Sequence, residues 1–489
     1  MARFNTKTKI AGKTENYAGG EAFKETPELK LVSILLTSFV QDQYYRSSED
    51  TLEELKSAIA ECDKEFVAKA AVYARAQFGM RSISHVTAAE LAHFISGKPW
   101  AKNFYDQIIY RVDDMSEILA YYYTKNGKAL PRAMVKGFAK AFDKFNAYQL
   151  AKYRGEGNEV SLVDVVNLVH PRPTDGNEKA LKDLIAGTLR STETWESKLT
   201  IAGQEAKDEE DKEKLKKKVW VDLIKNKKIG YFALLRNLRN IAEQAPEIVD
   251  EACELLTDEN LIKKSLVLPF RFMTATRQLQ EDGVKSAAIY RAINEALEIS
   301  FANVPKFKGK TLVVVDHSGS MDSVEHGNLS NFEIGALFGV ALAKTNDADF
   351  MYFGDTAKYA GINPVDSTPT IVEKLAGLND GGSTDVGHGT NFHAIFEEAS
   401  GAYNRIVIFS DMQGWVGYDA PTSTFSEYKK RTSANPFIYS FDLAGYGSLQ
   451  FPEGNTFCLA GFSEKIFTIM KLLEEDRHAL VKKIEATTL

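Results

Sequence analysis

The sequence contains few cysteines and no long hydrophobic run. Its three cysteines, Cys62, Cys253 and Cys458, are isolated along 489 residues, so they fit neither a disulfide framework nor the paired spacing of a zinc site. The nearest approach to a membrane span, Leu31 to Val40, is interrupted by Ser and Thr and is too short to cross a bilayer. The first residues, Met-Ala-Arg-Phe-Asn-Thr-Lys, contain no apolar segment of the kind that directs secretion. We therefore expect a folded cytoplasmic protein with buried thiols and no membrane partner.

Motifs of the common catalytic sites are also missing. The sequence has no nucleophile elbow, no phosphate-binding Walker loop and no zinc-binding helix motif. Asp316, His317 and Ser318 include the three residue types of a catalytic triad, but successive side chains at the end of a strand point in alternating directions and cannot form an ordered relay. We therefore expect a protein that is not an enzyme.

Two parts of the chain differ in pattern and charge. Up to residue 305, helical periodicity dominates, whereas apolar strands alternate with helices from residue 306 to 489. Residues 1–305 hold 45 Lys and Arg against 44 Asp and Glu, a net charge of +1, and the remainder holds 15 against 23, a net charge of −8. The pattern predicts an all-α, HEAT-like helical-repeat domain over 1–305 and an α/β domain over 306–489. A basic surface, if present, must be local.

The strand predicted over Thr311–Asp316 ends in a row of oxygen-bearing side chains. Asp316, Ser318 and Ser320 follow a run of apolar, mostly β-branched residues that is typical of a central parallel strand. Ligands bind beyond the carboxyl ends of such strands. Hard oxygen ligands suit Mg²⁺, or another divalent cation, better than zinc or a redox metal. The segment therefore predicts a metal site, with a plain polar turn as the alternative.

Two later segments supply further ligands. A second apolar strand, Arg405–Asp411, ends in Asp411, and Thr390 lies on a loop just before a predicted helix. Thr384 is a rival for the threonine position; we prefer Thr390 because a helix follows it at once. This arrangement resembles the metal-ion-dependent adhesion site of von Willebrand factor A domains, with ligands Asp316, Ser318, Ser320, Thr390 and Asp411.

One stretch of the helical part is strongly basic. Arg132, Lys136, Lys140 and Lys144 recur every four residues, and Asp143 is the one acidic residue between Lys125 and Arg154. We expect these four cations to line one face of a single helix over 132–146, opposite the apolar residues Met134, Phe138, Phe142 and Phe145. Like charges at this spacing repel one another. The stripe therefore favours an anionic partner such as RNA, and a solvated helix face is the alternative.

Motifs along the whole chain resemble those of the Ro ribonucleoprotein family, in which a TROVE module precedes a von Willebrand A domain. They are Asn16-Tyr-Ala-Gly-Gly20, Leu130-Pro-Arg132, Ser161-Leu-Val-Asp164, Leu168-Val-His170-Pro171-Arg-Pro173 and Ala233-Leu-Leu-Arg236-Asn237-Leu238, followed by the Val313–Ser320 strand and site. The order and spacing of these motifs carry the resemblance, which is to the bacterial type of Ro protein.

The resemblance implies a fold and a function. It implies a ring of HEAT-like helices closed by the A domain, with a positively charged central hole, in a monomeric protein. It further implies binding of small noncoding Y RNAs and of the single-stranded 3′ ends of misfolded RNAs, with pairing to an exoribonuclease such as polynucleotide phosphorylase. Lys136, Lys140, Lys144, His170 and Arg172 would face the RNA. A protein-interaction scaffold that uses the metal site of its A domain, without RNA, is the competing hypothesis.

Overall fold

The structure is a computed structural model of the chain. It describes residues 13–16, 18–24, 26–37, 48–155, 157–189, 194–265, 267–302, 304–323, 328–377, 379–380, 383–414, 416, 421–444, 446, 448–450, 455–459, 465–476 and 478–489. No helix among these residues is long and apolar enough to cross a membrane.

The chain divides into two compact units that are not continuous in sequence. The first unit comprises Met1–Glu61, Val267–Arg277 and Asn294–Lys483; the second comprises Cys62–Leu266, Gln278–Ile293 and Ile484–Leu489. The boundary expected at residue 305 thus lies within the first unit, and the divisions fall inside helices α17 (Phe270–Glu281) and α18 (Ala287–Ser300).

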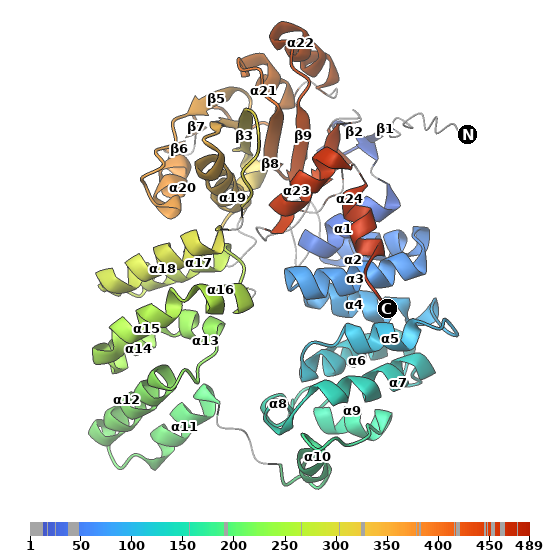
Figure 1. Cartoon of the computed structure of the whole chain (residues 1–489), viewed down its shortest axis with the longest axis vertical. Helices are drawn as coiled ribbons and strands as arrows, with labels where there is room; N and C mark the ends of the chain where they lie inside the picture. Colours follow the sequence, from blue (N-terminus) through green and yellow to red (C-terminus); the bar gives the residue numbers. More distant parts are fainter. Residues whose placement is uncertain are drawn as a thin grey trace. The chain divides into compact units, whose positions relative to one another are not determined.

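The second unit is helical. Each of its helices packs mainly against helices one to three places away along the chain, as in helical-repeat proteins (Figure 1). Its helices are α3 (Lys64–Phe78), α4 (Ser82–Glu90), α5 (Ala101–Gln107), α6 (Val112–Asn126), α7 (Arg132–Ala141), α8 (Ala147–Lys152), α9 (Leu162–Val169), α10 (Glu178–Ile185), α11 (Trp195–Glu205), α12 (Glu209–Lys225), α13 (Tyr231–Arg236), α14 (Leu238–Gln244), α15 (Val249–Leu256) and α16 (Glu259–Ser265), with short 3₁₀ turns at Leu91–His93, Phe142–Lys144 and Pro246–Ile248.

Helices α5 and α7 pack unusually closely at a glycine. A Cβ atom added to Gly137 on α7 would lie 2.4 Å from the Cβ of Tyr105 and 2.6 Å from the carbonyl oxygen of Lys102. Only a residue without a side chain fits at this crossing. The close approach brings the last turn of α5 against the basic residues of α7.

The α/β part of the first unit is built on a six-stranded sheet. Its strand order is β11-β9-β8-β3-β4-β5, in which β4 and β5 pair antiparallel and all other neighbours pair parallel. The strands are β3 (Thr311–Asp316), β4 (Asp349–Phe353), β5 (Ala357–Ala360), β8 (Arg405–Ser410), β9 (Phe437–Asp442) and β11 (Thr456–Leu459). All residues of β3 and β8 are buried, as the apolar runs predicted for central strands.

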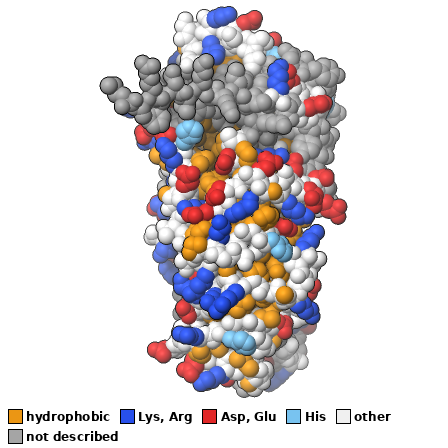
Figure 2. All heavy atoms as spheres, turned by 90° about the vertical axis from the view of Figure 1, so that its right-hand side faces the viewer, with side chains coloured by type: hydrophobic (Ala, Val, Ile, Leu, Met, Phe, Trp, Pro, Cys, Tyr) orange, Lys and Arg blue, Asp and Glu red, His pale blue; other side chains and the backbone are white. Residues whose placement is uncertain are grey.

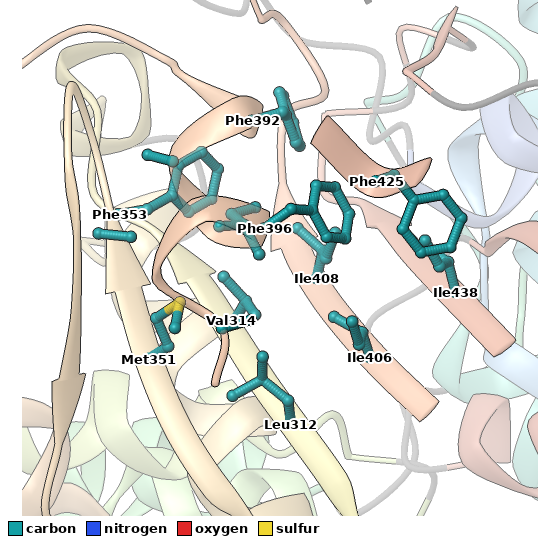
Figure 3. Close-up of a cluster of buried hydrophobic side chains, with 14 of the residues drawn as sticks. Leu312, Val314, Met351, Phe353, Phe392, Phe396, Ile406, Ile408, Phe425 and Ile438 are labelled. Carbon is teal, nitrogen blue, oxygen red and sulfur yellow. The ribbon is translucent and has the colours of Figure 1, made fainter. Parts of the chain in front are cut away.

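Helices connect these strands or follow the last of them. They are α19 (Asn331–Asn346), α20 (Thr368–Ala376), α21 (Phe392–Glu398), α22 (Thr422–Thr432), α23 (Lys465–Glu475) and α24 (Ala479–Glu485), with a 3₁₀ turn at Gly319–Asp322 and a two-stranded ribbon of β6 (Asn379–Asp380) and β7 (Ser383–Thr384). On the face that carries α21 and α22, Phe353, Phe392, Phe396 and Phe425 pack over the apolar side chains of the central strands (Figure 3). This core holds the strand ends, and hence the site beyond them, in a fixed arrangement.

The N-terminal residues add a small sheet to the first unit. Strands β1 (Lys13–Glu15) and β2 (Glu21–Lys24) form a hairpin, and β2 pairs antiparallel with β10 (Ser448–Leu449). Helices α1 (Pro27–Thr37) and α2 (Ser48–Glu61) follow. The sequence pattern did not indicate these strands, because each is at most four residues long.

Candidate functional site

Asp316, Ser318 and Ser320 lie together at the carboxyl end of β3. Asp316 is fully buried; its Oδ1 accepts the backbone N–H of Ser318 at 2.9 Å, and its Oδ2 accepts the hydroxyl of Ser410 at 2.5 Å. The hydroxyl oxygens of Ser318 and Ser320 are 3.4 Å apart. Since β3 and β8 are parallel neighbours, Ser410 also brings Asp411 to this edge.

Burial destabilises the charged form of both carboxyls, Asp316 and Asp411. Burial, followed by repulsion from Asp316, raises the pKa of Asp411 well above its usual range, although a hydrogen bond from Ser320 opposes this. Burial raises the pKa of Asp316 to about 6, against hydrogen bonds from Ser410 and Ser318. A bound cation would stabilise both ionised carboxylates.

Thr390 lies on a loop that contacts the β3 loop. It is buried, and the backbone N–H of Gly319 donates to the carbonyl of His388 at 3.0 Å, which joins the loop of Thr390 to the loop of Ser318 and Ser320. Asn391 caps α21 by accepting the N–H of His393. Thr384 lies in β7, but its side chain is outside the described part of the structure.

The donor set fits a hard divalent cation. Asp316, Asp411, Ser318, Ser320 and Thr390 are all buried and offer oxygen atoms only, the ligand type that Mg²⁺ takes. Among the described residues, no group of three or more His, Cys, Asp or Glu side chains could hold a metal. A cation here would therefore depend on hydroxyl ligands in addition to the two carboxylates.

Residues from the N-terminal segment hold the loop that follows Asp411. The side-chain amide of Asn16 donates to the carbonyl of Gly414 at 2.6 Å, and its Oδ1 accepts the backbone N–H groups of Ala18 and Gly20. From the other side, Gln450 donates to the carbonyl of Met412 at 2.8 Å. The loop is thereby fixed at two of its carbonyls.

Asp442 is a third buried carboxyl at this edge, which the sequence reasoning did not single out. It ends β9 in register with Ser410, and the hydroxyl of Ser33 on α1 lies 3.4 Å from its Oδ2. The sequence carried a usable indication, because Phe437–Asp442 is a further apolar strand that ends in aspartate.

The basic residues of α7 are exposed, as predicted, but they do not share one α-helix. Arg132, Lys136 and Lys140 lie on α7, which ends at Ala141, and Lys144 lies in the 3₁₀ turn that follows. The prediction of a single helix over 132–146 was therefore wrong. The apolar side is as expected: it consists of the buried residues Met134, Phe138, Phe142 and Phe145.

Asp106 neutralises part of this basic surface. Its Oδ2 lies 2.8 Å from the Nζ of Lys140 and its Oδ1 lies 2.8 Å from the Nζ of Lys144. Burial alone would raise the pKa of Asp106, but the hydrogen bonds and charges of the two lysines outweigh it and lower this pKa. The side chains of Lys140 and Lys144 remain 45% and 39% exposed, so solvent and a ligand can still reach them.

Four other predicted residues are exposed without such partners. Arg132, Lys136, His170 and Arg172 form no ion pair with any residue that the structure describes. His170 ends α9, which packs against α7, and it adopts a left-handed backbone conformation with φ of 48°. We call Arg132, Lys136, Lys140 and Lys144 the basic edge. Figure 2 shows the side of the molecule on which α3 to α10 lie in Figure 1, where Lys and Arg side chains are scattered among acidic and hydrophobic ones.

The chain has relatives in two groups of proteins. The TROVE domain model matches residues 31–198 and 185–310. The chain is 23% identical over 341 residues to telomerase protein component 1 of Mus musculus, covering 51% of this chain and 12% of that protein. It is 25% identical over 225 residues to the RNA-binding protein RO60 of Deinococcus radiodurans, covering 42% of each. It thus spans less than half the length of these relatives.

A solved structure shares the fold over nearly the whole chain. The crystal structure of the Deinococcus radiodurans RO (RSR) protein matches with a TM-score of 0.58 at 17% sequence identity, covering 95% of this chain and all of that one. The predicted fold class, helical repeats combined with an α/β domain, is thereby confirmed. From its motifs and from the TROVE match over more than half of its length, the chain belongs to the TROVE domain family, and it is related to the bacterial type of Ro protein.

Proposed function

We propose that this protein binds RNA through the basic edge. One observation carries the proposal: Arg132 and Lys136 are exposed and form no ion pair with a described residue. They lie beside Lys140 and Lys144 on the part of the chain that matches the TROVE domain. A relative in Deinococcus radiodurans is named an RNA-binding protein. Phosphate contacts by such side chains give affinity without sequence preference.

More specifically, we propose small noncoding RNA of the Y type and the single-stranded 3′ ends of misfolded RNAs as ligands, with the protein acting as a scaffold in RNA quality control. His170 and Arg172, at the end of α9, would extend the contact beyond α7. An exoribonuclease is the partner class that could use RNA ends held in this way. Binding, rather than catalysis, would be the role of the protein, in the cytoplasm and as a monomer.

We propose, separately, that the α/β part holds Mg²⁺ or another divalent cation. Asp316, Ser318, Ser320, Thr390 and Asp411 would hold it, and its positive charge would stabilise the two buried carboxylates in their ionised form. The cation would also offer a docking point for a carboxylate of a partner protein.

RNA binding can be tested with a double substitution on the free cations of the edge. We expect Arg132→Ala with Lys136→Ala to weaken binding of a 3′-tailed RNA duplex and to reduce the slope of log Kd against log salt concentration by about 1.4, or roughly 0.7 for each single-stranded phosphate contact. Fluorescence anisotropy over a salt series measures both quantities.

A matched control removes the same charge elsewhere. Lys214 and Lys263 form ion pairs within their own helices, with Glu210 and Glu259, so Lys214→Ala with Lys263→Ala should leave affinity and salt slope nearly unchanged. Equal effects of the two double variants would contradict the assignment to the basic edge. Failure of the unaltered protein to bind RNA at low salt would instead favour a protein-interaction scaffold.

A further inference from the structure

We infer that Tyr110 is a stacking platform for one unpaired RNA base, placed next to the phosphate contacts of the basic edge. The inference rests on the proposed RNA-binding function and adds aromatic stacking on a base, which the lysines do not provide. Tyr110 lies between α5 and α6, and the residue is 47% exposed.

The ammonium group of Lys144, a lysine of the basic edge, contacts the loop that carries the ring. The Nζ of Lys144 donates to the carbonyl of Ile109 at 3.3 Å, directly before Tyr110 in the chain, and it also pairs with Asp106. A strand whose phosphate contacts Lys144 would therefore pass close to the tyrosine ring. Successive nucleotides of a single strand carry alternate phosphates and bases, so such a strand can satisfy both contacts.

Buried charges hold Tyr110 in place. Its backbone N–H donates to Oδ2 of Asp114 at 2.9 Å, and the guanidinium carbon of Arg75 lies over its ring at 5.3 Å from the centroid. Arg75 in turn donates to both carboxylate oxygens of Asp114, at 3.2 and 3.0 Å. Asp114 is fully buried and lies 3.0 Å from Nε2 of His85. Backbone and ring are thus tied to the same carboxylate.

This rigidity separates Tyr110 from an ordinary exposed aromatic residue. Arg75 lies over the ring, and the residue remains 47% exposed. A base that stacks on the exposed part of the ring would therefore meet a side chain that is already held in place. Tyr148 is exposed to a similar extent, 50%, but it contacts no ring or cation among the residues that the structure describes. It provides a matched comparison.

The hydroxyl of Tyr110 has no hydrogen-bond partner within the described structure. Tyr110 contacts Asp114 through its backbone N–H and Arg75 through its ring. A phenylalanine at this position would keep both contacts. A stacking role therefore predicts that Tyr110→Phe binds RNA like the unaltered protein. Alanine, by contrast, would remove the ring.

The test compares two single-stranded oligonucleotides with the same number of phosphates, oligouridylate and an abasic oligonucleotide of the same length. We expect Tyr110→Ala to weaken oligouridylate binding by roughly 5- to 150-fold, the range for one base–aromatic stack, and to leave binding of the abasic strand unchanged. Tyr110→Phe and Tyr148→Ala should each stay within about twofold of the unaltered protein for both strands. Thermal unfolding of each variant checks that the helical unit is intact.

The possible outcomes distinguish a failure of this inference from a failure of the proposed RNA-binding function. If the unaltered protein binds both strands and Tyr110→Ala has no effect, or weakens both equally, Tyr110 is no base platform, while RNA binding stands. If Tyr110→Ala unfolds the protein, Tyr110→Leu keeps an apolar side chain without a π face, and its normal affinity for oligouridylate would overturn the inference. If the unaltered protein binds neither strand at low salt, the proposed function itself fails.

Discussion

Replacing Asp106 with asparagine should tighten RNA binding, although it removes two ion pairs. The Asp106 carboxylate lies 2.8 Å from the ammonium groups of both Lys140 and Lys144, so the three side chains together carry one net positive charge. A phosphate held on the outer side of either lysine would lie about 6 Å from this carboxylate, where two unit charges repel by about 0.7 kcal/mol at the dielectric constant of water. Asparagine removes that repulsion.

The expected effect is therefore about a threefold gain in affinity, and more if water is partly excluded from the contact. Because the edge gains one net positive charge for phosphate contact, the slope of log Kd against log salt concentration should steepen by about 0.7 for a single strand. Fluorescence anisotropy with a labelled oligonucleotide, repeated from low to physiological salt, measures both quantities.

Asp143→Asn is the matched control for this change. Asp143 is exposed, lies next to Lys144 in the chain and forms no ion pair with a described residue. Its replacement removes the same charge without releasing a lysine, so its effect should be smaller. Weaker binding by Asp106→Asn would show that the carboxylate positions the lysines for RNA rather than competing with it, and it would refute the reasoning.

Other substitutions test the packing and the metal site. Gly137→Ala should lower the free energy of unfolding by about 2 kcal/mol or more, because the added Cβ would meet Tyr105 and Lys102. Gly203→Ala on α11 should be neutral or stabilising by up to about 1 kcal/mol, because its added Cβ meets nothing within 4 Å. Denaturant unfolding of the two variants measures this difference. Asp316→Ala should abolish the stabilisation by Mg²⁺, about 2.7 kcal/mol at a concentration of 100 Kd, and a remaining thermal shift would exclude it as a ligand. In the unaltered protein the Mg²⁺ affinity should fall as the pH drops, because the pKa of both Asp411 and Asp316 is raised, that of Asp316 to about 6, and protons then compete with the cation; calorimetric titration at several pH values shows whether it does. Asn16→Ala should weaken Mg²⁺ binding by freeing the carbonyl of Gly414, whereas Asn177→Ala, which also loses buried hydrogen bonds but in the helical unit, should reduce stability alone.

The local sequence pattern was sufficient to predict the strands and the helix that position the predicted metal ligands. The strand Thr311–Asp316 has the predicted bounds, and the strand Arg405–Ser410 ends one residue before the predicted Asp411; every residue in both is buried. The helix after Thr390 begins at Phe392, as expected. These boundaries depend on neighbouring residues, which a sequence displays directly.

The sequence also indicates that the helix containing Arg132 ends before Asn146. Asn146 and Gln149 form a capping box that starts α8, and a residue that caps a new helix cannot continue the previous one. The helix predicted over 132–146 therefore had to end before Asn146.

The pairing of the lysines with Asp106 could not be predicted in the same way. Asp106 lies on α5, and it reaches Lys140 and Lys144 only because Gly137 lets α5 and α7 approach closely. Likewise, Asn16 binds Gly414 across 398 residues of sequence. Contacts of this kind depend on tertiary packing, which no local periodicity encodes.

The pairing of β2 with β10 can form only late in the synthesis of this protein. Asn16 leaves the ribosome 398 residues before the carbonyl that it binds, so at roughly 5 to 20 residues per second the hairpin waits between about 20 and 80 seconds for its partners. Until then, the edge of β2 is an unpaired strand that can pair with other nascent chains. Completion of the α/β part late in translation thus also closes a hairpin made much earlier, and a truncated chain would leave that edge exposed.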